Sequence, residues 1–225
     1  MTMIMIMATT TAGTTTMADD GRLRRLRRSI QILGALAVVL VGATGWLILR
    51  PGGPLVDAQQ GATVQIGAPF ELVSHKGETF SDRDLAGKPY TVFFGFTHCP
   101  EVCPTTLWEM SSALDQLGDE AANMQVLFVT VDPERDTPQV LASYLQSFDD
   151  RIIGLTGTLE DVSAMASSYR AYWRKVPTDD GDYTMDHTAS VYLMDANGDF
   201  FGTVAYEEPA DARMGKLRRL IATGS

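Results

Sequence analysis

Both cysteines of the sequence lie in one short segment, Cys99-Pro100-Glu101-Val102-Cys103. Two thiols with three residues between them can face one point, where they can form a disulfide or bind one metal ion. The segment follows an apolar run that ends at Phe96 and precedes a helical pattern that begins near Pro104. A thiolate at a helix N-terminus is stabilised by free backbone N–H groups and by the helix dipole. We therefore predict a reactive or metal-binding dithiol rather than two structural cysteines.

A histidine is the third residue of the candidate site. Dithiol oxidoreductases normally use Cys-x-x-Cys, and a proline precedes the strand that faces their cysteines. Here the residues before the predicted strand Ser190–Met194 are polar and contain His187, with no proline in Met185–Ala189. Two thiolates and one imidazole form a soft ligand set of low coordination number. Thiolate selects Cu(I), and imidazole allows the same site to accept Cu(II).

The other histidines and the acidic loops are weaker candidates for metal binding. A structural zinc ion would need a fourth ligand from His75 or His98, but His98 adjoins Cys99 and is expected to point elsewhere. The segment Asp132–Asp136 could be a carboxylate metal site. We interpret it as a strand-to-helix loop near the cysteines, in which the arginine pairs with a carboxylate. The segment Asp195–Asp199 lacks the spacing of a calcium loop and is interpreted as a turn.

The elements that must position these residues alternate between strand and helix patterns. Continuous apolar runs at Thr91–Phe96 and Val126–Val131 are typical of central strands buried on both faces. Apolar residues three and four apart predict a helix from Pro104 to about Leu117. Asn197-Gly198 between apolar runs predicts a hairpin. The order β, β, α, β, α, β, α, β-hairpin, α predicts an α/β protein of thioredoxin-like fold, with a mixed central sheet flanked by helices.

A basic and apolar leader precedes this domain. The uncharged segment Ile30–Leu49 has about the 20 residues that a helix needs to cross a bilayer. Arginines cluster before it and only Arg50 follows closely, so the positive-inside rule places the N-terminus in the cytoplasm. A cleaved signal peptide, with a loose small-residue site at Val56–Ala58, is the alternative. We divide the chain into a cytoplasmic segment expected to be disordered (1–29), one N-terminal transmembrane anchor (30–49), a linker (50–63) and a thioredoxin-like domain (64–225).

The composition restricts the function classes. The formal net charge is −10, with 45% hydrophobic and 20% charged residues, which is near the globular average and excludes a wholly disordered chain. Two cysteines cannot build a disulfide-rich miniprotein or a zinc ribbon with four cysteine ligands. Acidic residues dominate after residue 50, so we expect no nucleic-acid partner.

Three separated motifs resemble the Sco (SenC) family. They are Phe94–Pro104 (FGFTHCPEVCP), Val131–Pro138 (VDPERDTP), and Asp186-His187 followed after a strand by Asp195–Gly198 (DANG). They occur in the family's order, and the resemblance extends over roughly Val64–Leu220. Proteins of this family are copper chaperones of cytochrome c oxidase assembly, commonly tethered by one N-terminal span.

The resemblance implies a ligand set, a cargo and partners. Copper, as Cu(I) or Cu(II), would bind to Cys99, Cys103 and His187, and Cys99 and Cys103 could form a disulfide. The recipient would be the dinuclear copper centre of cytochrome c oxidase subunit II, and other copper chaperones would be partners. The domain would lie in the bacterial periplasm or the mitochondrial intermembrane space. We favour the periplasm, and hence a single-pass protein of the inner (cytoplasmic) membrane.

Two enzymatic alternatives use the same cysteines. A thiol–disulfide oxidoreductase that reduces the copper-site cysteines of the oxidase subunit would use Cys99 and Cys103 as its redox pair. Such an enzyme does not require an imidazole at His187, whereas a copper site does. A peroxidase is a weaker hypothesis, because Phe96 and Pro100 stand where a threonine is expected three residues before each cysteine. We expect a metallochaperone rather than an enzyme.

Overall fold

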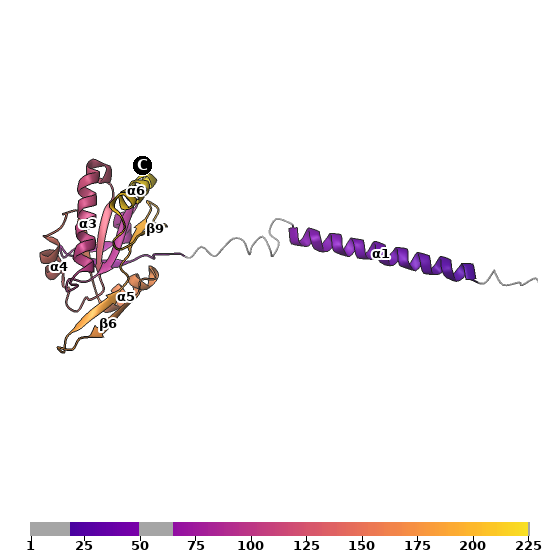
Figure 1. Ribbon diagram of the computed structural model, residues 1–225, viewed down its shortest axis with the longest axis horizontal. Helices are drawn as coiled ribbons and strands as arrows, with labels where there is room; N and C mark the ends of the chain where they lie inside the picture. Colours follow the sequence, from indigo (N-terminus) through magenta and orange to yellow (C-terminus); the bar gives the residue numbers. More distant parts are fainter. Residues whose placement is uncertain (1–18, 50–64, 225) are drawn as a thin grey trace, which may run out of the picture. The chain divides into compact units, whose positions relative to one another are not determined.

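The computed structural model describes residues 19–49 and 65–224, and the chain divides after Thr63 into two units. The described part of the N-terminal unit is the helix α1 (Asp19–Leu49), drawn as a continuous ribbon in Figure 1. Its segment Arg24–Leu47 is long and apolar enough to cross a membrane.

Helix α1 begins before the predicted span. Residues 19–29 were expected to be disordered, but they are helical. The reason is local, since the stretch Arg22–Arg28 consists of arginine and leucine, which are both strong helix formers. The predictions for residues 1–18 and for the linker 50–63 lie outside the described residues.

A mixed sheet forms the centre of the C-terminal unit, as predicted. It has seven strands in the order β2-β1-β5-β4-β3-β8-β9. The pairs β3–β4 and β4–β5 are parallel, and the other neighbours are antiparallel. The strands are β1 (Glu71–Ser74), β2 (Thr79–Ser81), β3 (Tyr90–Gly95), β4 (Gln125–Thr130), β5 (Ile152–Thr156), β8 (Val191–Met194) and β9 (Phe200–Val204).

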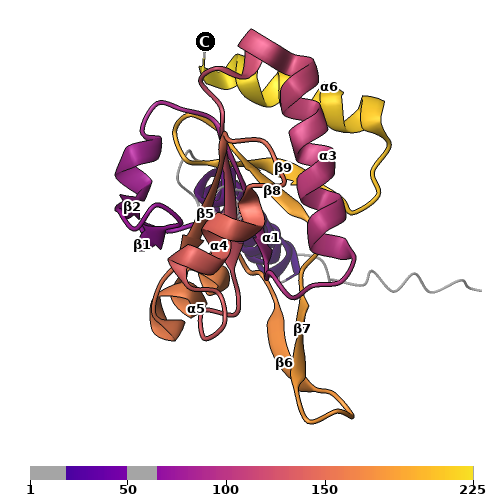
Figure 2. The same cartoon turned by 90° about the vertical axis from the view of Figure 1, so that its left-hand side faces the viewer.

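Helices flank this sheet. Figure 2 shows α3 and α4 in front of the strands, and a separate hairpin that extends below them. The α-helices of this unit are α3 (Val102–Leu117), α4 (Pro138–Leu145), α5 (Leu159–Ser168) and α6 (Ala210–Ile221), and the short 3₁₀ helices are η1 (Asp82–Leu85), η2 (Gly118–Ala121) and η3 (Ala222–Gly224).

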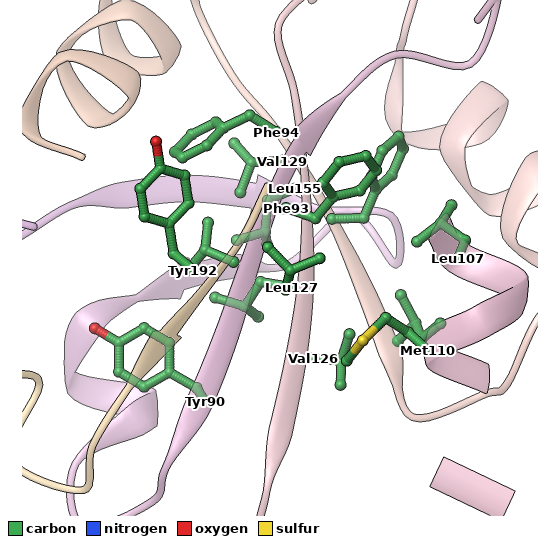
Figure 3. Close-up of a cluster of buried hydrophobic side chains, with 14 of the residues drawn as sticks. Tyr90, Phe93, Phe94, Leu107, Met110, Val126, Leu127, Val129, Leu155 and Tyr192 are labelled. Atoms are coloured by element: carbon green, nitrogen blue, oxygen red, sulfur yellow. The ribbon is translucent and has the colours of Figure 1, made fainter. Parts of the chain in front are cut away.

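The core fixes the end of β3, from which the cysteine segment starts. Every residue of β3 is buried. Side chains of the central strands alternate between the two faces of the sheet: Phe93 and Val126 point toward Met110 of α3, whereas Phe94 and Tyr192 lie on the opposite face (Figure 3). Full burial of one such side chain contributes about 1.5–3 kcal/mol. The strand end is therefore a rigid support.

The hairpin below the sheet was missed in the sequence. Strand β6 (Trp173–Pro177) pairs with β7 (Tyr183–His187), with Trp173 opposite His187. His187 was expected in an irregular polar segment, but it is the last residue of β7. The alternating apolar signal of a strand is weak here because both strands are half-exposed and carry charged residues, so the pattern predicts a loop.

Gly95 ends β3 and allows the sulfur of Cys103 to approach the strand. A Cβ atom at this position would lie 2.7 Å from Cys103 Sγ and 2.7 Å from Cε2 of Phe128. We expect Gly95→Ala to cost about 1–3 kcal/mol of unfolding free energy, because the overpacked core must shift. Urea unfolding measures this cost. Gly202→Ala in β9 is the matched control, since a Cβ there meets nothing within 4 Å, and equal midpoints for the two variants would contradict the prediction.

Candidate metal centre

The segment between β3 and α3 places both cysteines at the start of a helix. The N–H of Cys99 donates to the carbonyl of Phe96 across 3.3 Å, which turns the chain. Cys103 lies in the first turn of α3 and is buried, whereas Cys99 is half-buried, and both are free thiols. The N–H of Cys103 donates to Sγ of Cys99 across 3.4 Å. The Cys99 sulfur thus accepts one of the N–H groups that a helix N-terminus leaves free.

His187 approaches the cysteines from the end of β7. Its Nε2 lies 3.4 Å from Sγ of Cys103, and its Nδ1 lies 3.1 Å from the carbonyl of Thr188. Because a carbonyl can only accept, Nδ1 carries the proton and Nε2 keeps a free lone pair. The imidazole packs edge-on against Phe93 and Phe96, at centroid distances of 6.0 Å and 5.7 Å. The ring is therefore held in the tautomer and orientation that a metal ligand needs.

The structure brings the three predicted residues together. The ligand atoms of Cys99, Cys103 and His187 all lie within 4.8 Å of one another. A three-coordinate metal with bonds of about 2.0–2.3 Å needs ligand atoms about 4 Å apart, so small shifts of the side chains suffice. Among the described residues, His75 and His98 do not belong to this group. His75 accepts a hydrogen bond from the N–H of Gly154 at 3.0 Å, and His98 is exposed.

The two thiols differ strongly in acidity. A hydrogen bond from the Cys103 thiol lowers the pKa of Cys99 to about 4, despite the burial that opposes ionisation. Burial raises the pKa of Cys103 far above the usual value of a thiol. At neutral pH Cys99 is a thiolate, and Cys103 keeps one proton with two acceptors, Cys99 and His187, within reach. A metal ion that displaces this proton gains a second thiolate ligand.

The difference in acidity predicts which thiol reacts first. Without metal, we expect iodoacetamide to modify Cys99 before Cys103, at a rate that is nearly constant between about pH 6 and 9, because a thiol with a pKa of about 4 is ionised throughout that range. Mass spectrometry of the tryptic peptides measures both rates. A Cys99 rate that rises about tenfold per pH unit, as for an ordinary thiol, would contradict the prediction.

The segment Asp132–Asp136 is the predicted strand-to-helix loop, and it contacts the site. Arg135 pairs with Asp132, as expected. Asp136 is fully buried and accepts hydrogen bonds from the N–H and the hydroxyl of Thr97, at 3.0 Å and 2.6 Å. Protein donors thus occupy both carboxylates, which favours the loop interpretation over a carboxylate metal site. The contact between Asp136 and Thr97 was missed, and its only signal in the sequence was the proximity of two strand ends.

The fold and the site together define a class of protein. A thioredoxin-like domain in which a dithiol at a helix N-terminus faces an imidazole presents three ligand atoms of the kind that fit a soft metal. The family model described as SCO1/SenC matches residues 58–222. The chain belongs to the SCO1/SenC family.

Solved structures and curated relatives agree with this assignment. ScoI of Bradyrhizobium japonicum with copper bound is 46% identical, with a TM-score of 0.65 over 69% of this chain and 99% of that one. Yeast Sco1 with copper bound is 34% identical, with a TM-score of 0.65 over 71% and 90%. The human mitochondrial protein SCO1 homolog is 38% identical over 161 residues, which are 70% of this chain and 52% of that relative. The chain therefore spans about half the length of this relative.

Proposed function

We propose that this chain is a copper chaperone of cytochrome c oxidase assembly. It carries copper on Cys99, Cys103 and His187 and delivers it to the dinuclear copper centre of oxidase subunit II. The observation that carries the proposal is the approach of two sulfur atoms and one imidazole nitrogen to within 4.8 Å of one another. Support comes from family members that were solved with copper bound.

The geometry suits a metal that is held and then released. Soft thiolates bind Cu(I), and the imidazole nitrogen allows Cu(II) to be held as well. Three ligands leave a coordination position for an entering ligand of the recipient. Cys99 is half-buried and Cys103 is buried, so ligand exchange begins at Cys99. Other copper chaperones would load the site by the same exchange in reverse.

We also propose that α1 anchors the protein in the inner membrane, with the C-terminal domain in the periplasm. The support is the apolar segment Arg24–Leu47 and the cluster of arginines before it. The division of the chain after Thr63 supports a tethered domain at 64–225.

A thiol–disulfide oxidoreductase acting on the oxidase subunit is the second candidate function. The observation that favours it is the pKa of Cys99, which is lowered to about 4 by the thiol of Cys103. A half-exposed thiolate beside a second thiol is the arrangement of a redox pair. Cys99 and Cys103 would then cycle between dithiol and disulfide.

Copper analysis of residues 55–225, with both cysteines reduced, tests the proposed function. We expect one tightly held copper ion per chain, because the part of the domain that the structure describes has one complete ligand set. Atomic absorption gives the stoichiometry after extensive dialysis. Two or more retained ions, or none, would contradict the proposal.

A further inference from the structure

We propose that the loop Asp132–Asp136 positions the two halves of the metal site independently. In this proposal Asp136 holds the cysteine segment, and Asp132 with Arg135 holds the hairpin that carries His187. Cys103 and His187 are 84 residues apart in the sequence, and one lies on helix α3 while the other ends strand β7, so no local structure sets the distance between them. The inference rests on the copper-binding function proposed above.

The first contact fixes the cysteine segment. Asp136 is fully buried, and its Oδ2 accepts hydrogen bonds from the N–H of Thr97 at 3.0 Å and from the hydroxyl of Thr130 at 2.6 Å. Its Oδ1 accepts a hydrogen bond from the hydroxyl of Thr97 at 2.6 Å. Thr130 is the last residue of β4, and Thr97 is two residues before Cys99. Asp136 therefore ties the start of the cysteine segment to the end of a buried central strand.

The second contact fixes the hairpin. The hydroxyl of Tyr183 donates to Oδ1 of Asp132 across 2.9 Å, and Nη1 of Arg135 donates to the carbonyl of Tyr183 across 3.0 Å. The guanidinium of Arg135 also lies 3.7 Å above the ring of Tyr183. Asp132 is almost fully buried, so this anchor is part of the core. Tyr183 begins β7 and His187 ends it. The contacts of Asp132 and Arg135 with Tyr183 therefore restrict the movement of β7, the strand that carries the imidazole of His187.

The carboxylates of Asp136 and Asp132 belong to one loop, but the first positions the cysteine segment and the second positions the strand of His187. The N–H of Asp136 donates to the carbonyl of Asp132 across 2.9 Å, so the loop is itself rigid. Loss of one contact should loosen one half of the site and leave the other half in place. Groups that orient metal ligands typically contribute 10–100-fold to metal affinity. This selectivity distinguishes positioning from a general contribution to folding.

The test uses two variants of the full chain in detergent micelles, each of which removes a single hydroxyl. Thr97→Val removes one hydrogen bond to Asp136, and Tyr183→Phe removes the hydrogen bond to Asp132 but keeps the ring under Arg135. Two measurements are made: the iodoacetamide reaction rate of Cys99 without copper, and the absorption spectrum and affinity of added copper.

We expect Thr97→Val to raise the Cys99 rate several-fold, because the sulfur becomes more accessible, and to weaken copper binding about 10–100-fold. We expect Tyr183→Phe to leave the Cys99 rate unchanged but to shift the copper spectrum and weaken copper binding about tenfold. Thr97→Ser should restore wild-type values, since it keeps the hydroxyl, and urea unfolding checks that each variant is folded.

The outcomes separate the inference from the function on which it rests. Failure of the wild-type chain to bind copper would refute the copper function, and the Cys99 rates of the two variants would still test the first contact. If both variants are folded and both keep the copper spectrum and the Cys99 reaction rate of the wild-type chain, the inference is overturned. Equal changes in both measurements for both variants would also overturn it, because they would indicate general loosening of the domain.

Discussion

Oxidation of Cys99 and Cys103 to an intramolecular disulfide is expected to abolish copper binding. Both sulfurs must be thiolates to bind the metal, and a disulfide removes both ligands at once. The imidazole of His187 alone is a weak site. The measurement is copper content after complete oxidation, with alkylation showing that no free thiol remains. Re-reduction should restore one copper ion per chain.

The local geometry indicates that this oxidation needs little rearrangement. The two sulfurs lie within 4.8 Å of each other, and a disulfide requires about 2.05 Å. Cys103 is fixed in the first turn of α3, so Cys99 in the preceding segment must make most of the movement. Copper retained by fully oxidised protein would show that the ligands are other residues.

The sheet and its helices could be predicted because their signals are local. The runs Thr91–Phe96 and Val126–Val131 are apolar at every position or nearly so, and such runs become the parallel central strands β3 and β4. The hairpin β6–β7 could not be recognised in this way. Its strands are stabilised by pairing with each other and by contacts such as that between Tyr183 and Asp132.

The candidate site was partly predictable from the order of the elements. Cys99 and Cys103 share one helix N-terminus, and His187 precedes strand β8, which pairs with β3, so the order of the strands brings them into the same region. The support from Asp136 was not predictable, because its contact with Thr97 spans 39 residues. A buried carboxylate cannot be distinguished from a solvated one in an acidic loop by sequence pattern.

His187→Ala is expected to lose tight copper binding and oxidase assembly, yet to keep most thiol–disulfide exchange. Removal of a direct ligand should weaken copper binding by more than the 10–100-fold that is typical for groups that only orient ligands. Exchange depends on the Cys99 thiolate, which keeps its hydrogen bond from the N–H of Cys103. The measurements are copper affinity, oxidase activity in a complemented deletion strain, and the rate of reaction with a small disulfide.

The fold should survive this substitution. The backbone pairing of His187 with Trp173 remains, and the lost ring contacts with Phe93 and Phe96 cost about 1 kcal/mol. His98→Ala is the matched control, since His98 adjoins Cys99 in sequence but is exposed and outside the ligand group, so it should keep copper.

The result for His187 decides between the two functions that share the dithiol. A copper chaperone needs the imidazole, because two thiolates alone do not provide the third ligand. A reductase needs only the acidic Cys99 and its partner thiol, and both remain in His187→Ala. A folded His187→Ala variant that assembles oxidase at normal copper supply would therefore refute the ligand role and make the reductase the better assignment. Loss of assembly with exchange intact would show that the dithiol alone is not sufficient, which is the behaviour of a metal carrier.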